Sequence, residues 1–202
     1  MTAPREEPRL QPDMEDPTDL AAPFELEIKD LGDRRREYTY KTDPYQGTRS
    51  RVTTIWKRKS YFAHKDGEIY PNVYLDESGD GRLRVVKEIV PRKIDGGNRY
   101  SELETMFRVI NTVGPDYSRL FVEFLGWFES SCGLSLVLEY CALGDIDQCF
   151  AEPVPEQVAK TVAGQLLEGI AALHILGITH RDIKPEVYYL HQSARWIGGR
   201  LE

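Results

Sequence analysis

The chain has 202 residues, of which 41% are hydrophobic and 10% aromatic, and a formal net charge of -7, which suits one ordinary domain with a core. The acidic balance provides neither a basic surface for nucleic acid nor a polybasic membrane anchor, and no stretch is apolar enough to span a bilayer or act as a signal segment. The three cysteines (Cys132, Cys141 and Cys149) fit neither a disulfide framework nor zinc spacing, so we expect reduced thiols and an intracellular protein, in cytoplasm or nucleus.

The N-terminal region, residues 1–52, is predicted to be disordered. Residues 1–30 hold five prolines and nine acidic against three basic residues, and such a segment buries too little apolar surface to fold. From about residue 31 the balance turns basic, with the runs Arg34–Arg36 and Lys57–Lys59. Runs of like charge usually form a solvated face, and that interpretation is favoured here over ligand binding.

The central part of the chain predicts strands with one helix between them. Runs rich in β-branched and aromatic residues predict strands at 52–56, 72–75, 83–90, 121–125 and 134–140. Between them, Leu103, Met106, Phe107 and Ile110 recur at helical spacing and predict a helix over 100–113. Strands, a helix, strands and then a further helix indicate an α+β fold with an antiparallel sheet.

The second predicted helix covers about 156–176 and leads into the most informative motif of the chain. Val158, Val162, Leu166, Ile170 and Leu173 form one apolar stripe, and Gly177 ends the helix. The sequence His-Arg-Asp-Ile-Lys-Pro follows at 180–185. It closely resembles the catalytic loop of protein kinases, and the lysine two residues after the aspartate resembles the serine/threonine class.

This resemblance implies a protein-kinase-like fold, ATP and Mg²⁺ as cofactors, and a protein as substrate. Asp182 would act as the base beside the attacking hydroxyl, and Lys184 would stabilise charge on the moving phosphoryl group. Lys87, on the strand 95 residues before Asp182 (182 minus 87), would anchor the ATP phosphates, with Glu102 favoured over Glu104 as its ion-pair partner. The remaining nucleotide-binding positions implied by the resemblance are Val73, Val85, Leu138, Glu139 and Cys141.

The chain departs from the family pattern at the phosphate loop and at the metal ligands. Asp66, Glu68 and Pro71 stand where the family has glycines, which puts two carboxylates near a polyphosphate and removes one N–H donor. Val187 replaces the asparagine that would hold magnesium, and no Asp-Phe-Gly motif follows Asp182. Val187 cannot ligate a hard cation, so we assign no metal ligand in this chain and expect weak or absent Mg-ATP binding.

The family resemblance therefore predicts a partial kinase domain over 53–187 and a tail without kinase character over 188–202. It covers the small lobe, with its antiparallel sheet and one helix, and only the start of the helical large lobe. The abrupt break within the catalytic loop suggests a truncated or misread gene product. Two alternatives stay open beside an incomplete protein serine/threonine kinase: a non-catalytic, pseudokinase-like module that binds a protein partner, and a non-functional fragment.

Overall fold

The computed structural model describes residues 21–41, 53–63, 69–89, 100–112, 119–131, 133–146, 154–184, 196–197 and 200–201. The substituted positions Asp66, Glu68 and Val187, and most of the predicted 188–202 tail, lie outside the described residues. Within them, no helix is both long and apolar enough to cross a membrane.

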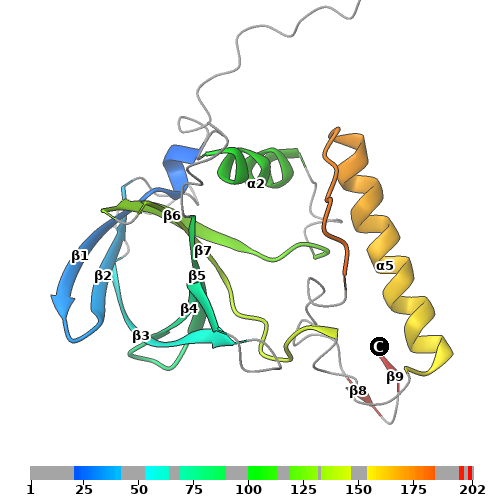
Figure 1. The fold of residues 1–202 in the computed structure, drawn as a ribbon, viewed down its shortest axis with the longest axis horizontal. Coiled ribbons are helices and arrows are strands. Elements are labelled where there is room, and N and C mark those ends of the chain that lie inside the picture. Colours follow the sequence, from blue (N-terminus) through cyan, green and yellow to red (C-terminus); the bar gives the residue numbers. More distant parts are fainter. Residues whose placement is uncertain are drawn as a thin grey trace, which may run out of the picture.

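A seven-stranded antiparallel sheet forms the body of the molecule (Figure 1). Its strands, in spatial order, are β1 (Leu26–Gly32), β2 (Arg35–Tyr40), β3 (Thr53–Ala63), β4 (Ile69–Ser78), β5 (Leu83–Ile89), β7 (Gly133–Glu139) and β6 (Phe124–Ser130). A short 3-10 helix, η1 (Ala22–Phe24), precedes β1, and two-residue strands β8 (Trp196–Ile197) and β9 (Arg200–Leu201) pair near the C-terminus. The predicted antiparallel α+β architecture is confirmed.

The two helices occupy the predicted segments. Helix α2 (Ser101–Thr112) packs one apolar face on the sheet, and α5 (Glu156–Ile175) stands to the side of the sheet (Figure 1). At the end of α5, the Gly177 N–H donates to the carbonyl of His174 and the Ile178 N–H to that of Leu173, both at 2.9 Å. This is a Schellman cap, and Gly177 adopts the left-handed φ of 68° that it requires.

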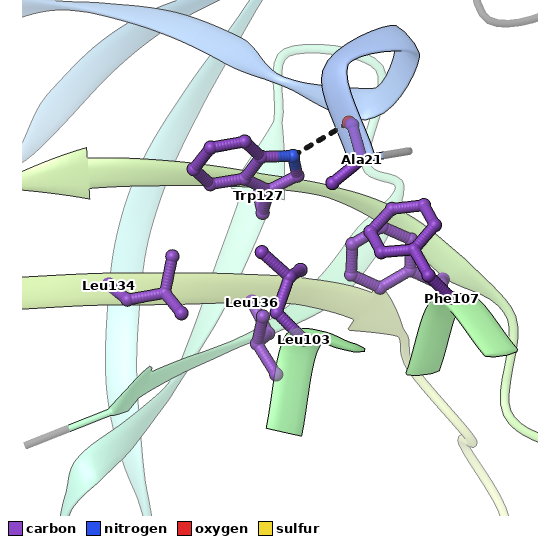
Figure 2. Packing of buried hydrophobic residues seen from close by; sticks show 7 residues of the cluster. Ala21, Leu103, Phe107, Trp127, Leu134 and Leu136 are labelled. Atoms are coloured by element: carbon purple, nitrogen blue, oxygen red, sulfur yellow. Dashed lines mark hydrogen bonds between the residues drawn. The ribbon is translucent and has the colours of Figure 1, made fainter. Parts of the chain in front are cut away.

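The sheet carries a hydrophobic core on each of its two faces, because successive side chains of a strand point to opposite sides. On one face, Leu103 and Phe107 of α2 pack against Trp127, Leu134 and Leu136 (Figure 2). On the other face lies a second cluster whose buried members are Leu26, Tyr38, Trp56, Tyr74, Val86, Phe128 and Val137. Tyr74 shows the alternation, since it is fully buried here while its neighbour Val73 belongs to the first face.

The expectation that residues 1–52 are disordered was wrong for the described part, 21–41. This segment forms η1, β1 and β2, and β2 pairs with β3 from Arg35 opposite Lys57 to Thr39 opposite Thr53. The charged composition of this segment concealed two buried side chains, Leu26 in β1 and Tyr38 in β2, each of which lies among neighbours that are less buried. A strand with only one apolar face can still be ordered when another part of the sheet covers that face.

The sheet is strongly curved, so that β1 and β6, which stand at the two ends of the strand order, lie next to each other. Glu25, beside β1, forms a bridge with Trp127 of β6, and the Tyr40 hydroxyl donates to the Leu125 carbonyl at 2.6 Å. The Trp127 indole N–H donates to the carbonyl of Ala21 at 2.8 Å (Figure 2). The sheet is therefore close to a closed barrel, with the second cluster inside it.

Candidate active site

Lys87 lies at the centre of the sheet and pairs with a glutamate of α2. In β5 it stands opposite Val73 of β4 on one side and Leu136 of β7 on the other. Its Nζ lies 2.5 Å from Oε1 of Glu102. Leu103 and Phe107, buried against the sheet, hold α2 on this face and so place Glu102 beside the strand. The predicted pairing of Lys87 with Glu102 is thus present.

The predicted adenine-side residues share this face with Lys87. Val85 stands opposite Leu138 of β7, and Val73 stands opposite Lys87. Residues directly opposite each other in an antiparallel sheet project to the same side. Val73, Val85 and Leu138 are half-buried, so this apolar surface still has area to offer to a flat ligand.

Some backbone groups at the end of β7 and just after it already form hydrogen bonds within the protein. The Glu139 N–H donates to the Glu123 carbonyl at 3.0 Å, and the Glu139 carboxylate accepts from the Glu123 N–H at 3.0 Å. Cys141 is half-buried, and its carbonyl accepts from the Gly144 N–H at 3.0 Å in a tight turn. Burial, and secondarily the charge of Glu139, raises the pKa of the Cys141 thiol to about 11. Cys141 is therefore a protonated thiol at neutral pH.

Asp182 and Lys184 lie together after α5. The Lys184 Nζ is 3.1 Å from Oδ2 of Asp182, and both side chains are exposed. The Asp182 N–H faces Nδ1 of His180 at 3.4 Å, and Arg181 between them has a φ of 64°. A non-glycine residue in this region is strained, and such strain is often kept at functional loops. No motif in the sequence indicates this conformation.

One contact that sequence reasoning missed ties this loop to α2. Arg108 Nη2 donates to the carbonyl of Leu176, the C-terminal cap of α5, at 2.6 Å. The segment after α5 then runs back along the side of α5 that faces α2 and the sheet (Figure 1). Arg108 belongs to the same helix as Glu102, so α2 contacts both the strand that carries Lys87 and the approach to Asp182.

The described residues of the site offer a cation and an apolar surface, but no cluster of metal ligands. Lys87 supplies a cation and the Val73–Val85–Leu138 surface supplies an apolar wall. Pro71, which lacks an N–H for a phosphate, lies within β4 where the register with β3 shifts between Tyr61 and Ala63. The described residues contain no group of three His, Cys, Asp or Glu side chains placed to hold a metal ion. With valine at 187, the residues present do not fit magnesium, which prefers oxygen ligands.

Comparison with known proteins agrees with this geometry. The chain is 39% identical over 92 residues to the serine/threonine-protein kinase ksp1 of Schizosaccharomyces pombe, which is 42% of this chain and 19% of that protein. It is 30% identical over 128 residues to the MAP kinase kinase kinase mkh1 of the same organism (58% of this chain, 11% of that protein). It is 32% identical over 108 residues to the probable serine/threonine-protein kinase 2 of Plasmodium falciparum (52% of this chain, 20% of that protein).

The chain thus spans only a fifth or less of the length of these relatives. The model of the protein kinase domain family matches residues 70–194, more than half of the chain, and leaves β1, β2 and β3 before the match. With the ordered sheet, the Lys87–Glu102 pair and the His-Arg-Asp sequence, this match shows that the chain belongs to the protein kinase domain family.

Proposed function

We propose that this chain provides the nucleotide-contacting and catalytic-loop residues of a protein serine/threonine kinase. The observation that carries the proposal is the 2.5 Å ion pair between Lys87 and Glu102. Both side chains are more than a third exposed, so the pair adds little to folding stability. Its value is positional, because Glu102 holds the Lys87 ammonium on the face that also presents Val85 and Leu138.

On this proposal, each remaining site residue has one task. Val73, Val85 and Leu138 cover one side of the adenine base of ATP. The backbone of Glu139 and Cys141 forms hydrogen bonds with the polar edge of that base. Asp182 accepts the proton of a serine or threonine hydroxyl, and Lys184 stabilises charge on the transferred group. The 3.1 Å contact between Lys184 Nζ and Asp182 Oδ2 keeps the two side chains together on the same loop.

The 202-residue chain by itself is expected to bind nucleotide weakly and to transfer phosphate poorly. When bound, ATP supplies the phosphoryl group, and the charge that develops on it needs a metal ion. This chain offers valine at 187 and has no Asp-Phe-Gly sequence. The sparse cysteines support an intracellular setting, where the substrate or partner is a protein.

A second candidate function, a non-catalytic module that binds a protein partner, is favoured by Pro71. That residue lies in a strand at the place where a phosphate loop needs N–H donors. The two candidates differ in what they predict for nucleotide: the kinase proposal requires binding that depends on Lys87, and the binding module requires none.

Titration calorimetry of the full chain with ATP, with and without magnesium, tests the proposal. We expect Lys87→Met to weaken ATP binding about tenfold or more, because a charge-assisted contact contributes about 1.5–3 kcal/mol. Lys57→Met is the matched control, since Lys57 is an exposed lysine of the same sheet that pairs with Asp33 at 3.1 Å.

Equal binding by both variants and the unmodified chain would place the nucleotide elsewhere. No binding by the unmodified chain would favour the non-catalytic module. Transfer of labelled phosphate to a serine-containing peptide, measured in parallel, separates binding from catalysis.

A further inference from the structure

A cavity open to solvent lies against the N-terminal hairpin, on the face of the sheet opposite Lys87. The cavity has a volume of about 240 Å³ and is lined from the hairpin side by Arg34, Arg36 and Tyr38. Residues of β3 and β4, among them Arg58 and Tyr74, complete the lining. We propose that this cavity binds a phosphomonoester group, held chiefly by Arg36 and Arg34.

The charges that line the cavity favour an anion. Four cationic side chains, those of Arg34, Arg36, Arg58 and Lys59, face two carboxylates, Asp30 and Asp76. Asp76 is already neutralised by Arg84, whose Nη2 lies 3.1 Å from its Oδ2. Arg58 and Lys59 are paired with the carboxylates of Glu88 and Glu77, at 3.3 Å and 2.6 Å. Among the described residues, Arg34 and Arg36 have no carboxylate within ion-pair distance.

Arg36 is the best placed of the four. It is half-buried, and its Nη1 donates to the Tyr74 hydroxyl at 3.3 Å. A neutral hydroxyl does not balance a guanidinium that has lost part of its water, so an anion that reaches Arg36 gains a desolvated, oriented donor. The raised pKa of Tyr74, which burial causes foremost, keeps that hydroxyl protonated and without charge of its own.

The walls of the cavity hold the Arg58 side chain and the backbone of Arg34 in place. The Arg58 guanidinium stacks 3.4 Å from the centre of the Tyr74 ring, and its backbone N–H donates to the Arg34 carbonyl at 2.9 Å. The turn of the hairpin is therefore fixed to β3, with Arg34 at its tip in a left-handed conformation (φ 58°). Fixed guanidinium groups lose less entropy when they bind a planar or tetrahedral oxyanion.

Size selects the class of ligand. Pockets for drug-sized molecules occupy about 300–1,000 Å³, so 240 Å³ suits a head group better than a whole nucleotide. A phosphomonoester brings a charge of about -1.5 to -2 and three acceptor oxygens, which matches two arginines without carboxylate partners. The group can come from a phosphorylated side chain of a protein segment or from a small phosphorylated molecule. The proposal is independent of nucleotide binding, because Tyr74 and Val73 project to opposite faces of β4.

Fluorescence polarisation with the full chain tests the proposal and separates the two sources. The probes are labelled peptides that carry phosphoserine, phosphothreonine or phosphotyrosine, with their unphosphorylated forms as blanks. Inorganic phosphate and free phosphoserine serve as competitors. The variants are Arg36→Gln and Arg34→Gln. The matched control is Arg35→Gln, because Arg35 is exposed and does not line the cavity.

We expect saturable binding that the unphosphorylated peptides lack, weakened about tenfold by Arg36→Gln, which corresponds to about 1.4 kcal/mol, and unchanged by Arg35→Gln. A peptide that binds much more tightly than free phosphoserine identifies a protein segment as the source, and equal affinities identify a small phosphate. No phosphate-dependent binding, or equal loss in Arg35→Gln and Arg36→Gln, overturns the proposal. Arg36→Lys checks folding, since it keeps the charge and should retain part of the affinity.

Discussion

The buried ion pair between Arg84 and Asp76 gives the sharpest test of how the barrel interior is stabilised. Arg84 Nη2 lies 3.1 Å from Asp76 Oδ2, and the two side chains are only 5% and 3% exposed. Lys57 and Asp33 form a pair at the same 3.1 Å, with side chains 49% and 71% exposed. The two pairs differ in burial and not in length, so they separate the effect of desolvation from that of distance.

Replacing Asp76 by asparagine leaves the Arg84 guanidinium buried without a counter-ion. Removal of one partner of a buried pair costs about 3–5 kcal/mol, and the asparagine amide oxygen keeps the loss near the lower end. Arg84 has no easy alternative partner, since it is stacked 4.0 Å from the Tyr38 ring centre and its Nε already lacks an acceptor among the described residues. A typical domain has only about 5–15 kcal/mol in total.

Urea denaturation of Asp76→Asn and Asp33→Asn, at low protein concentration, measures the difference. We expect a large fall in the free energy of unfolding for Asp76→Asn and little change for Asp33→Asn. In a thermal scan the first variant should lose about 6–20 °C, at about 2–4 °C per kcal/mol for a chain of this size. The double variant Asp76→Leu/Arg84→Met should recover most of the loss, because it leaves no unpaired charge. Equal, small effects of both single variants would refute the reasoning.

Three further predictions concern other parts of the chain. Gly126→Ala should lower the free energy of unfolding by about 1–3 kcal/mol, because the new Cβ would lie 2.9 Å from a backbone carbonyl oxygen at a residue with a φ of 149°. Gly79→Ala, which has open space around it, should have a smaller effect, and urea denaturation compares the two variants. Cys141 should react with iodoacetamide more slowly than free cysteine at pH 8, and its rate should rise as the pH approaches its pKa of about 11. Site-resolved mass spectrometry measures this rate, and equal rates for Cys141 and free cysteine would argue against burial of the thiol. The exposed Leu167 and Ile175 of α5, 64% and 84% accessible, should make the isolated chain self-associate, and their replacement by glutamate should shift sedimentation toward monomer; a monomeric unmodified chain would contradict this.

The apolar stripe predicted along α5 is covered to different degrees in the structure. Of its five residues, Val158 and Leu173 are buried, at 3% and 8% exposure. Val162, Leu166 and Ile170 are half-buried. The most exposed apolar side chains of α5, Leu167 and Ile175, lie beside the stripe and not within it.

Elements whose pattern is local could be predicted from the amino-acid sequence alone. The strand that carries Lys87, the helix that carries Glu102 and the glycine that ends α5 were all read from periodicity and capping residues. The partner of Lys87 could be predicted because one helical position, Glu102, faces the strand when Leu103 and Phe107 pack on the sheet. Local periodicity decides such matters, since side-chain direction follows from the element type.

The order of the N-terminal hairpin depends on contacts with strands that are distant in the sequence. Residues 26–40 have a charged composition, and they are ordered because β3 offers a free edge and the barrel interior accepts Leu26 and Tyr38. The bond from Trp127 to Ala21 joins residues 106 apart in sequence, a separation that no local pattern reveals. Arg36, which belongs to a run expected to be solvated, became half-buried because the sheet curls over it. Burial of a charge depends on which distant strand covers it, and that is fixed by closure of the sheet and not by the neighbours of the residue in the chain.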